Sequence, residues 1–202
     1  MEKLDIRTVQ GGPLDVNTYV VGLEGGDCCV LIDPGAEPEK VSSAVGERKV
    51  SAVLLTHGHF DHMLFANHWL ERGAKLYVHA LDADALAQSK MNLGHMIGVK
   101  LILPEADVLL QEGDVIREAG LELLVLHTPG HTPGGVCYQN GDVLFSGDTL
   151  FCGSYGRLDL PGGSVSNMRA SLLRLMQLDG DTVAYPGHGM KTKIAWERGN
   201  YA

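Results

Sequence analysis

The strongest constraint in the sequence is the stretch THGHFDH, residues 56–62, which places three histidines and an aspartate within seven positions. It directly follows residues 50–55, a short run of apolar and β-branched residues that predicts a buried strand. Alternate residues of a strand share a face, so the first two histidines should point the same way where the chain leaves the sheet. Asp61 and His62 then fall in the turn that opens residues 63–72, an amphipathic run that predicts a helix, and they can aim at a second point nearby.

These residue types at this spacing favour a site for a divalent metal ion. Neutral imidazole nitrogens and carboxylate oxygens supply lone pairs to hard and borderline cations without strong geometric demands. The alternative is a polar turn with no ligand, but several histidines crowded together would repel one another when protonated. We therefore interpret the stretch as one part of a metal site.

Three further segments repeat the same arrangement, in which an apolar strand ends, a glycine or proline loop begins and a metal-binding residue type stands at the junction. They are HTPGHTPGG (127–135), FSGDTLF (145–151) and YPGHG (185–189). Loops at strand ends are where a rigid scaffold presents functional side chains, and glycine lets the backbone turn sharply and pack closely there. These loops are candidates for the rest of the site.

The remaining sequence alternates short strands with helices. Apolar runs bounded by turn residues predict strands at 4–9, 18–23, 28–32, 75–79, 108–110, 115–117, 121–126, 135–139, 143–145 and 182–185. Helical spacing predicts helices at 38–45, 63–72 and 164–178, with Met168, Leu172, Leu175 and Met176 on one stripe of the last. Residues 81–87 also have helical spacing, whereas 91–99 are expected to form a mobile loop. Two sheets packed face to face, with helices outside, accommodate this order.

Composition narrows the class of protein. A chain of 202 residues with 45% hydrophobic content can bury one substantial core, so we expect a single domain over residues 1–202. The net charge of -9, with no basic cluster, disfavours a nucleic-acid partner. No run of signal-peptide or membrane-spanning length is present, so we expect a cytoplasmic protein with no membrane partner. Oligomeric state is open.

The four cysteines support the same cellular setting. Cys28, Cys29, Cys137 and Cys152 form no CxxC pattern, and the adjacent pair would face opposite sides of a strand. We expect all four to be buried thiols in a reducing compartment.

Taken in order, the four histidine and aspartate motifs resemble those of the metallo-β-lactamase superfamily, and specifically its glyoxalase II-like branch. The resemblance runs from LIDPG (31–35) to PGHG (186–189) and so covers nearly the whole chain. It implies an α/β fold of the αββα type, a sandwich of two mixed sheets with helices on the outer faces. It also implies two metal ions in a groove at one edge of the sheets.

The resemblance further implies a ligand for each position of a dinuclear site. The first metal would be held by His57, His59 and His131, the second by Asp61, His62 and His188, and Asp148 would bridge the two. Asp61 and Asp148 are thus the catalytic carboxylates. A bridging carboxylate can neutralise charge between cations roughly 3.5 to 4 Å apart, and a bridging water with a pKa of about 7 would supply hydroxide without a protein base. Zinc is favoured, with iron or manganese as alternatives.

Several residues near these motifs keep two interpretations. Asp33 either orients a ligand histidine or forms the turn before Pro34, and Thr56 has the same choice between orienting a ligand and ending a strand. The loop 152–157 resembles the loop that borders the groove in short members of the branch. Its Tyr155 and Arg157 are candidate substrate contacts, although Arg157 could instead pair with Asp159.

Other ionisable side chains receive weaker assignments. A second, weaker candidate set for an anionic end of the substrate comprises Lys191, Lys193 and Arg198. The histidines without partner spacing are expected to be structural or exposed; these are His68, His79, His95 and His127.

The expected reaction is cleavage of an anionic small-molecule thioester such as a hydroxyacylglutathione. Glyoxalase II proper has a C-terminal helical domain that supplies basic residues to glutathione; the sequence ends soon after His188, so we expect that domain to be missing, which leaves the thioester's identity open. One alternative is an oxidoreductase similar to persulfide dioxygenases of the same branch, which bind a single iron. A phosphodiesterase is a further alternative. Retention of Asp61, His62 and His188 provides for a second metal and favours hydrolysis.

Overall fold

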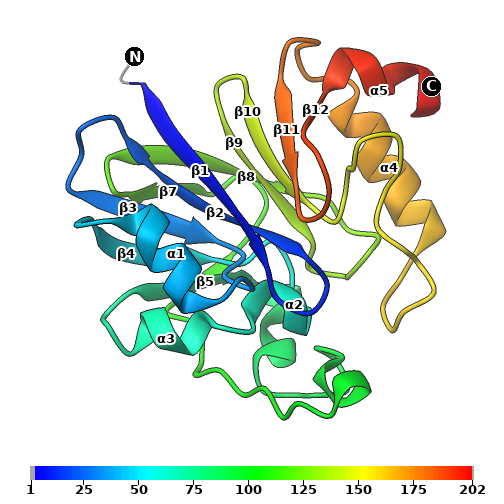
Figure 1. Cartoon of the computed structure of the whole chain (residues 1–202). Coiled ribbons are helices and arrows are strands. Elements are labelled where there is room, and N and C mark those ends of the chain that lie inside the picture. Colours follow the sequence, from blue (N-terminus) through cyan, green and yellow to red (C-terminus); the bar gives the residue numbers. More distant parts are fainter. Residues whose placement is uncertain (1–2, 202) are drawn as a thin grey trace.

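Two six-stranded mixed sheets lie face to face in the computed structural model, which describes residues 3–201 (Figure 1). The first sheet has the strand order β1-β2-β3-β4-β5-β6. Its strands are β1 (Leu4–Gly11), β2 (Val16–Leu23), β3 (Cys28–Ile32), β4 (Lys49–Leu54), β5 (Lys75–His79) and β6 (Val108–Leu110). The pairs from β1 to β3 are antiparallel, and those from β3 to β6 are parallel.

The second sheet has the strand order β12-β11-β10-β9-β8-β7. Its strands are β7 (Val115–Glu118), β8 (Leu121–His127), β9 (Val136–Asn140), β10 (Val143–Gly147), β11 (Val183–Pro186) and β12 (Thr192–Lys193). All pairs are antiparallel except β10 with β11. The β9–β10 hairpin turns at Gly141-Asp142, where Gly141 adopts a φ of 56° that glycine tolerates without strain.

Helices cover the outer faces of both sheets (Figure 1). The helices α1 (Pro38–Val45) and α3 (Ala66–Leu70) pack on the first sheet, whereas α4 (Val165–Leu175) and α5 (Ile194–Tyr201) pack on the second. The predicted αββα sandwich is therefore confirmed.

Three apolar layers hold these four layers of secondary structure together. The middle layer, between the sheets, includes Tyr19, Ile32, Tyr138 and Phe145. The first outer layer includes Leu31, Val53, Val41 and Trp69, and the second includes Cys137, Leu144, Met168 and Leu172. Both faces of the central strands are thus buried, which explains why residues 28–32 and 50–55 read as continuous apolar runs rather than as alternating patterns.

The helix α4 shows how the local sequence determines one of these elements. The Ser164 hydroxyl accepts a hydrogen bond from the Asn167 backbone N–H (3.3 Å) and caps the helix at its start. Met168, Leu172 and Leu175 are buried against the second sheet, as their spacing predicts.

The single helix predicted over residues 63–72 is wrong. Two short helices, α2 (Phe60–Met63) and α3, occupy this region, and the break lies at Phe65. The Phe65 backbone N–H donates to the Pro34 carbonyl (3.0 Å), because the LIDPG loop packs against it and takes the place of an intrahelical partner. As a result the helical structure begins earlier than predicted, and Asp61 and His62 lie on α2 rather than in a turn.

The region between β5 and β6 and the C-terminal residues show which other elements the sequence predicted and which it did not. Residues 91–99, expected to be a mobile loop, contain a short 3₁₀ helix, Gly94–Ile97, and residues 81–87 fall largely within another 3₁₀ helix, Ala80–Leu86. Neither β12 nor α5 was predicted, because a two-residue strand and a helix with weak amphipathic character leave little periodic signal.

The expectation that all four cysteines are buried is wrong for two of them. All four are free thiols, and Cys29 and Cys137 are buried, which raises the pKa of each to about 11. Cys28 is only half-buried because it opens β3 at the end of the sheet, and Cys152 is exposed because it lies in the turn between Phe151 and Ser154.

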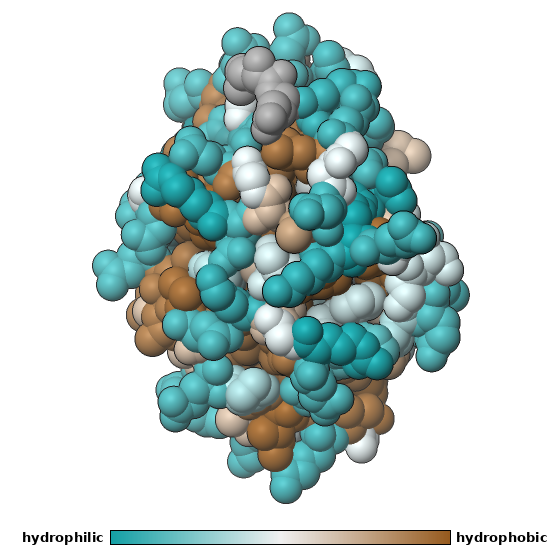
Figure 2. Space-filling model, turned by 90° about the vertical axis from the view of Figure 1, so that its left-hand side faces the viewer, coloured by the Kyte–Doolittle hydropathy of each residue, from teal (hydrophilic) through white to brown (hydrophobic). Residues whose placement is uncertain are grey.

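Polar side chains cover most of one face of the molecule (Figure 2). On the face shown in Figure 2, hydrophobic residues form small patches among hydrophilic ones. Within residues 3–201, the helices are too short to serve as candidate membrane spans.

Candidate metal centre

The histidine and aspartate motifs meet at one edge of the two sheets. His57 and His59 follow β4, Asp61 and His62 lie on α2, and His131, Asp148 and His188 lie in the loops that follow β8, β10 and β11. The last two loops are adjacent because β10 and β11 are parallel neighbours, and the Gly187 N–H donates to the Gly147 carbonyl (2.8 Å). The fold therefore brings together all seven residues that the sequence singled out.

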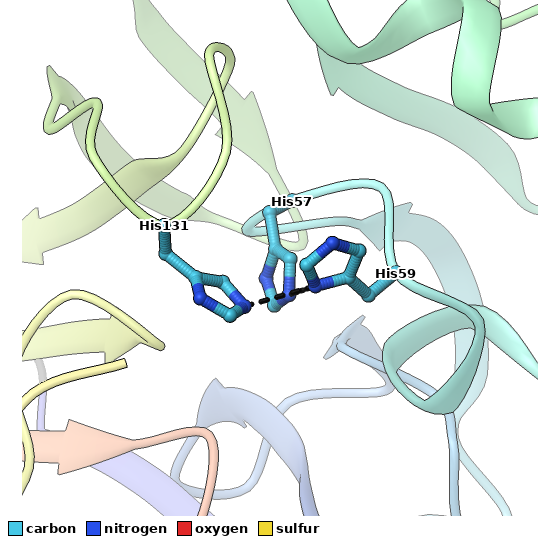
Figure 3. A group of neighbouring side chains, drawn as sticks. All are labelled: His57, His59 and His131. Atoms are coloured by element: carbon cyan, nitrogen blue, oxygen red, sulfur yellow. Dashed lines mark hydrogen bonds between the residues drawn. The ribbon is translucent and has the colours of Figure 1, made fainter. Parts of the chain in front are cut away.

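Three histidines form the first half of the cluster, and their rings point toward one another (Figure 3). His57 Nε2 lies 3.1 Å from His59 Nδ1, and His59 Nδ1 lies 2.9 Å from His131 Nε2. One ring nitrogen from each histidine lies within 4.8 Å of the other two. His131 comes from the second sheet, so this group also joins the two halves of the sandwich.

The second half of the cluster combines histidines with carboxylates. His188 Nε2 lies 3.2 Å from Asp61 Oδ2, and His62 Nε2 lies 3.6 Å from the same oxygen. Asp148 stands between the halves, with one oxygen 3.3 Å from His62 Nε2 and the other 3.5 Å from His131 Nε2. Its position is the one that a bridging ligand would occupy.

Burial and mutual proximity set the charge of these groups. Burial lowers the pKa of both His57 and His59, the second to about 3, and neighbouring histidines lower each further. Burial also acts to lower the pKa of His62, but the nearby carboxylates, Asp148 first, hold it well above its usual value. The pKa of Asp148 is below its usual value because the histidines outweigh the effect of burial. The rings of His57 and His59 are therefore neutral at pH 7 and keep free lone pairs, whereas Asp148 is ionised and favours the charged form of His62.

The cluster fits metal ions because its inner atoms lack partners within the protein. Two of the atoms that face the interior of the cluster, His62 Nε2 and Asp148 Oδ1, are buried with no hydrogen-bond partner in the described residues. Buried polar atoms without partners are rare and costly in proteins. Cations between the two halves would give the convergent nitrogens and oxygens their missing partners, and the donor set of imidazole and carboxylate suits zinc, iron or manganese.

Asp33 and Thr56 contact the outer nitrogens of two cluster histidines, on the side away from the centre of the cluster. Asp33 Oδ2 accepts hydrogen bonds from His62 Nδ1 (2.8 Å) and from the Thr56 hydroxyl (2.7 Å), and Asp33 Oδ1 accepts one from the Thr56 backbone N–H (2.8 Å). The Thr56 hydroxyl is also 3.1 Å from His57 Nδ1. Of the two interpretations of Asp33, the ligand-orienting one matches these contacts, since His62 Nε2 is thereby directed into the cluster.

Asp82 is a functional candidate that the sequence motifs did not reveal. Its buried carboxylate accepts hydrogen bonds from the Gly58 N–H (2.9 Å), the Thr132 hydroxyl (2.7 Å) and the Gly134 N–H (2.6 Å). Gly58 separates His57 from His59, and Thr132 follows His131. One side chain thus fixes both loops that carry the first three histidines.

A cavity of about 570 Å³ opens beside the cluster. Its lining includes His59, Asp61, His131, Asp148 and His188 together with the two candidate substrate contacts, Tyr155 and Arg157. The Arg157 carbonyl accepts a hydrogen bond from His131 Nδ1 (2.7 Å), while the Arg157 guanidinium pairs with Asp159. The main chain of Arg157 therefore supports the cluster, and its side chain has the partner that the alternative interpretation named.

The other charged candidates lie outside the cluster. Lys193 pairs with Asp181, and Arg198 donates to the carbonyls of Met176 and Leu178. Lys191 lies over the Tyr185 ring. The histidines outside the cluster follow the structural expectation; His79 and His127, for example, stack on each other with ring centroids 4.2 Å apart.

Gly187 gives a direct test of how tightly the cluster is built. A Cβ atom at this position would lie 2.3 Å from Asp148 Oδ1 and 2.5 Å from His62 Cε1. We expect Gly187→Ala to displace both side chains and to weaken metal binding by about 10- to 100-fold, the range seen when ligands lose their support. Titration of metal-free protein with zinc measures this.

Gly199→Ala is the matched control, because a Cβ at Gly199 meets no atom within 4 Å. Equal zinc affinity in the two variants would show that the cluster tolerates the displacement and would contradict the assignment of Asp148 and His62 as ligands.

Comparison with known proteins supports the interpretation of the fold and the cluster. The sequence model of the Metallo-beta-lactamase superfamily matches residues 11–188. The probable metallo-hydrolase YqgX of Bacillus subtilis (strain 168) is 33% identical, over 95% of this chain and 93% of the relative. The hydroxyacylglutathione hydrolase GloC of Haemophilus influenzae is also 33% identical, over 83% of each chain.

Solved structures lead to the same family. The BLEG-1 B3 metallo-β-lactamase superposes with a TM-score of 0.91 at 31% identity and covers 98% of both chains. The protein TTHA1623, solved in a di-iron-bound form, gives a TM-score of 0.80 at 39% identity over 95% of this chain and 96% of its own. With a family match across most of its length and relatives above 30% identity, the chain belongs to the metallo-β-lactamase superfamily.

Proposed function

We propose that the chain is a dinuclear metal-dependent hydrolase that cleaves a thioester. The observation that carries this proposal is the presence of both halves of the cluster at the wall of an open cavity. A site for one metal would need only the histidine group around His57, yet Asp61, His62 and His188 form a second group around Asp148. The relative TTHA1623 was solved with two irons, which supports the capacity of this fold for two metals.

Each metal position has its own ligands in this proposal. The first metal would be held by His57, His59 and His131, the second by Asp61, His62 and His188, with Asp148 shared. Two divalent cations bound there would lower the pKa of a coordinated water toward neutrality and polarise the substrate carbonyl. Zinc is the first choice, and iron or manganese would suit the same donors.

The protein's own residues keep the site ready for this chemistry. Asp33 and the Arg157 carbonyl accept the outer N–H groups of His62 and His131, which fixes the tautomer that presents Nε2 to the interior. Asp148 contributes negative charge at the centre of the site. Tyr155 and Arg157 border the cavity and would contact the substrate; Arg157 would exchange Asp159 for a substrate carboxylate, at small cost because exposed ion pairs are weak.

We favour thioester cleavage because the thiolate can leave without protonation by a further catalytic group. Water adds its oxygen to the acyl carbon, the C–S bond breaks, and the products are a carboxylic acid and a thiol, whose thiolate is a good leaving group. The hydroxyacylglutathione hydrolase of Haemophilus influenzae is a relative with a named activity of this kind. We place the protein in the cytoplasm, where such small anionic thioesters would be its partners.

The test is a panel of reactions with metal-loaded protein. Thiol release is measured with S-lactoylglutathione and with the acetyl thioester of N-acetylcysteamine, oxygen consumption with glutathione persulfide, and ring opening with a chromogenic β-lactam. We expect thiol release and no oxygen consumption. Oxygen consumption without thiol release would instead identify an iron oxidoreductase, and β-lactam opening alone would identify a lactamase.

Metal removal is expected to abolish activity and to lower stability together. A ligand that binds only the folded state stabilises it by about 4 kcal/mol at a thousand times its Kd. Protein dialysed against a chelator should therefore show a lower midpoint of thermal unfolding and no thiol release, and both should return when zinc is added. A midpoint unaffected by zinc would mean that the cluster does not bind it.

A further inference from the structure

One wall of the cavity beside the cluster is apolar and open to solvent. Leu14, Met96 and Ile97 line it, yet they are 54%, 62% and 43% exposed. Phe60 and Leu93 continue the same lining and are buried. Exposed apolar side chains that gather at a concave site mark a surface that an apolar ligand would cover.

The segment that carries Met96 and Ile97 is held in place by a buried amide. The Asn92 side chain donates to the carbonyls of Ala85 (2.9 Å) and Leu101 (3.3 Å) and accepts from the Gly94 N–H (2.9 Å). The Asn92 carbonyl accepts a hydrogen bond from the Phe60 N–H (2.8 Å), at the start of α2. The short 3₁₀ helix is therefore fixed next to the metal-binding residues (Figure 1, green, below α2).

The backbone of this segment also departs from its most favourable conformation. Leu93 has a φ of 66°, in the left-handed region of backbone conformation, which residues other than glycine and asparagine seldom adopt. This conformation turns the chain so that Leu93 is buried and the next residues form the 3₁₀ helix over the cavity. Strain of this kind is kept where the surrounding structure enforces it, often at ligand sites.

The cationic lining of the cavity is sparse by comparison. Among the described residues that line it, Arg157 is the one lysine or arginine, so the cavity offers one cationic side chain, which could receive a single carboxylate in exchange for Asp159. The thiol part of a glutathione thioester carries two carboxylates, which would need charged partners of this kind. The side chains of the apolar wall cannot pair with these carboxylates, whereas an uncharged apolar group would pack against the wall.

We propose, on the basis of the function proposed above, that the preferred substrate is a thioester carrying a bulky, uncharged apolar group, and that this group lies against Leu14, Met96 and Ile97. Hydrolysis then releases an acid and a thiol, one of which carries the apolar group. Glutathione thioesters are poor substrates in this view.

The experiment compares kcat/KM across matched thioesters with metal-loaded protein. One series keeps N-acetylcysteamine as the thiol and changes the acyl group from acetyl to hexanoyl or phenylacetyl; a second keeps acetyl and replaces the thiol by benzyl mercaptan. S-lactoylglutathione completes the set. We expect at least one apolar series to exceed both the acetyl reference and S-lactoylglutathione by about tenfold, the effect of one or two buried methylenes.

The variant Met96→Gln/Ile97→Thr tests the location of the apolar group. Both side chains are exposed, so the fold and the metal content should be retained, while the ratio of kcat/KM for the apolar thioester to that for the acetyl thioester should fall by about tenfold. Trp196→Gln removes an equally exposed apolar side chain outside the cavity and should leave the ratio unchanged.

The possible failures separate the two proposals. Turnover in which S-lactoylglutathione is the best substrate, or a substrate ratio that the double variant leaves unaltered, would overturn this inference and leave thioester hydrolysis standing. Absence of thiol release from every thioester would overturn the proposed function and this inference with it.

Discussion

Replacing Asp148 by alanine is expected to remove both metal ions and to lower hydrolytic activity by at least about a hundred- to a thousand-fold, the cost of losing a central electrostatic group. Asp148 lies within 3.5 Å of histidines from both halves of the cluster. Its removal would therefore weaken the binding of a metal ion in either half. Two cations without a carboxylate between them would repel each other at close range. Elemental analysis of the purified variant, alongside its rate of thiol release, gives the result.

Two measurements make this prediction specific to metal binding. The unfolding midpoint of metal-free Asp148→Ala should lie below that of the metal-free parent, because the ionised carboxylate lies 3.3 Å from His62 Nε2 and holds the pKa of His62 up. Metal content is therefore measured well below that midpoint. Arg157→Ala should retain both metals, because Arg157 supports the cluster through its carbonyl. Equal metal retention in Asp148→Ala and Arg157→Ala would contradict the bridging assignment.

Replacing Asp82 by alanine is expected to destabilise the protein by about 3 kcal/mol or more and to weaken metal binding by about 10- to 100-fold. The substitution leaves three donors, from Gly58, Thr132 and Gly134, without their acceptor in a buried place. The loops that carry His57, His59 and His131 would then lose their common anchor. Denaturant unfolding of metal-free protein and zinc titration well below the unfolding midpoint measure the two effects separately.

Asp84→Ala is the matched control on the same 3₁₀ helix, because Asp84 is exposed. Asp82→Asn should recover part of the zinc affinity, since an amide keeps one acceptor oxygen. If Asp82→Ala and Asp84→Ala bind zinc equally well, Asp82 does not position the cluster.

The sequence predicts the fold well, and most of the candidate ligands can be picked out because they stand where an apolar run meets a glycine or proline loop. Strand runs such as residues 28–32 and 50–55 are short, apolar and bounded by turn residues, so their type and position can be read locally. The parallel pairing of β10 with β11 makes Asp148 and His188 neighbours, and it cannot be read from the local sequence. That these two residues share a site was inferred from the resemblance of the ordered motifs.

Several of the errors have the same cause, which is that contacts with residues outside the segment decided its local structure. The break between α2 and α3 depends on a hydrogen bond from Phe65 to Pro34. The order of residues 91–99 depends on the buried Asn92 amide, although asparagine and glycine locally favour a loop. Asp82 was missed because it lies in no motif, and its partners at Gly58 and Thr132 are remote in sequence.

Anomalous diffraction from crystals of protein purified without added metal tests the central claim most directly. Two peaks roughly 3.5 to 4 Å apart are expected. One should be bonded to His57, His59 and His131 and the other to Asp61, His62 and His188, with Asp148 bonded to both. A single peak, or peaks away from these side chains, would contradict a dinuclear centre.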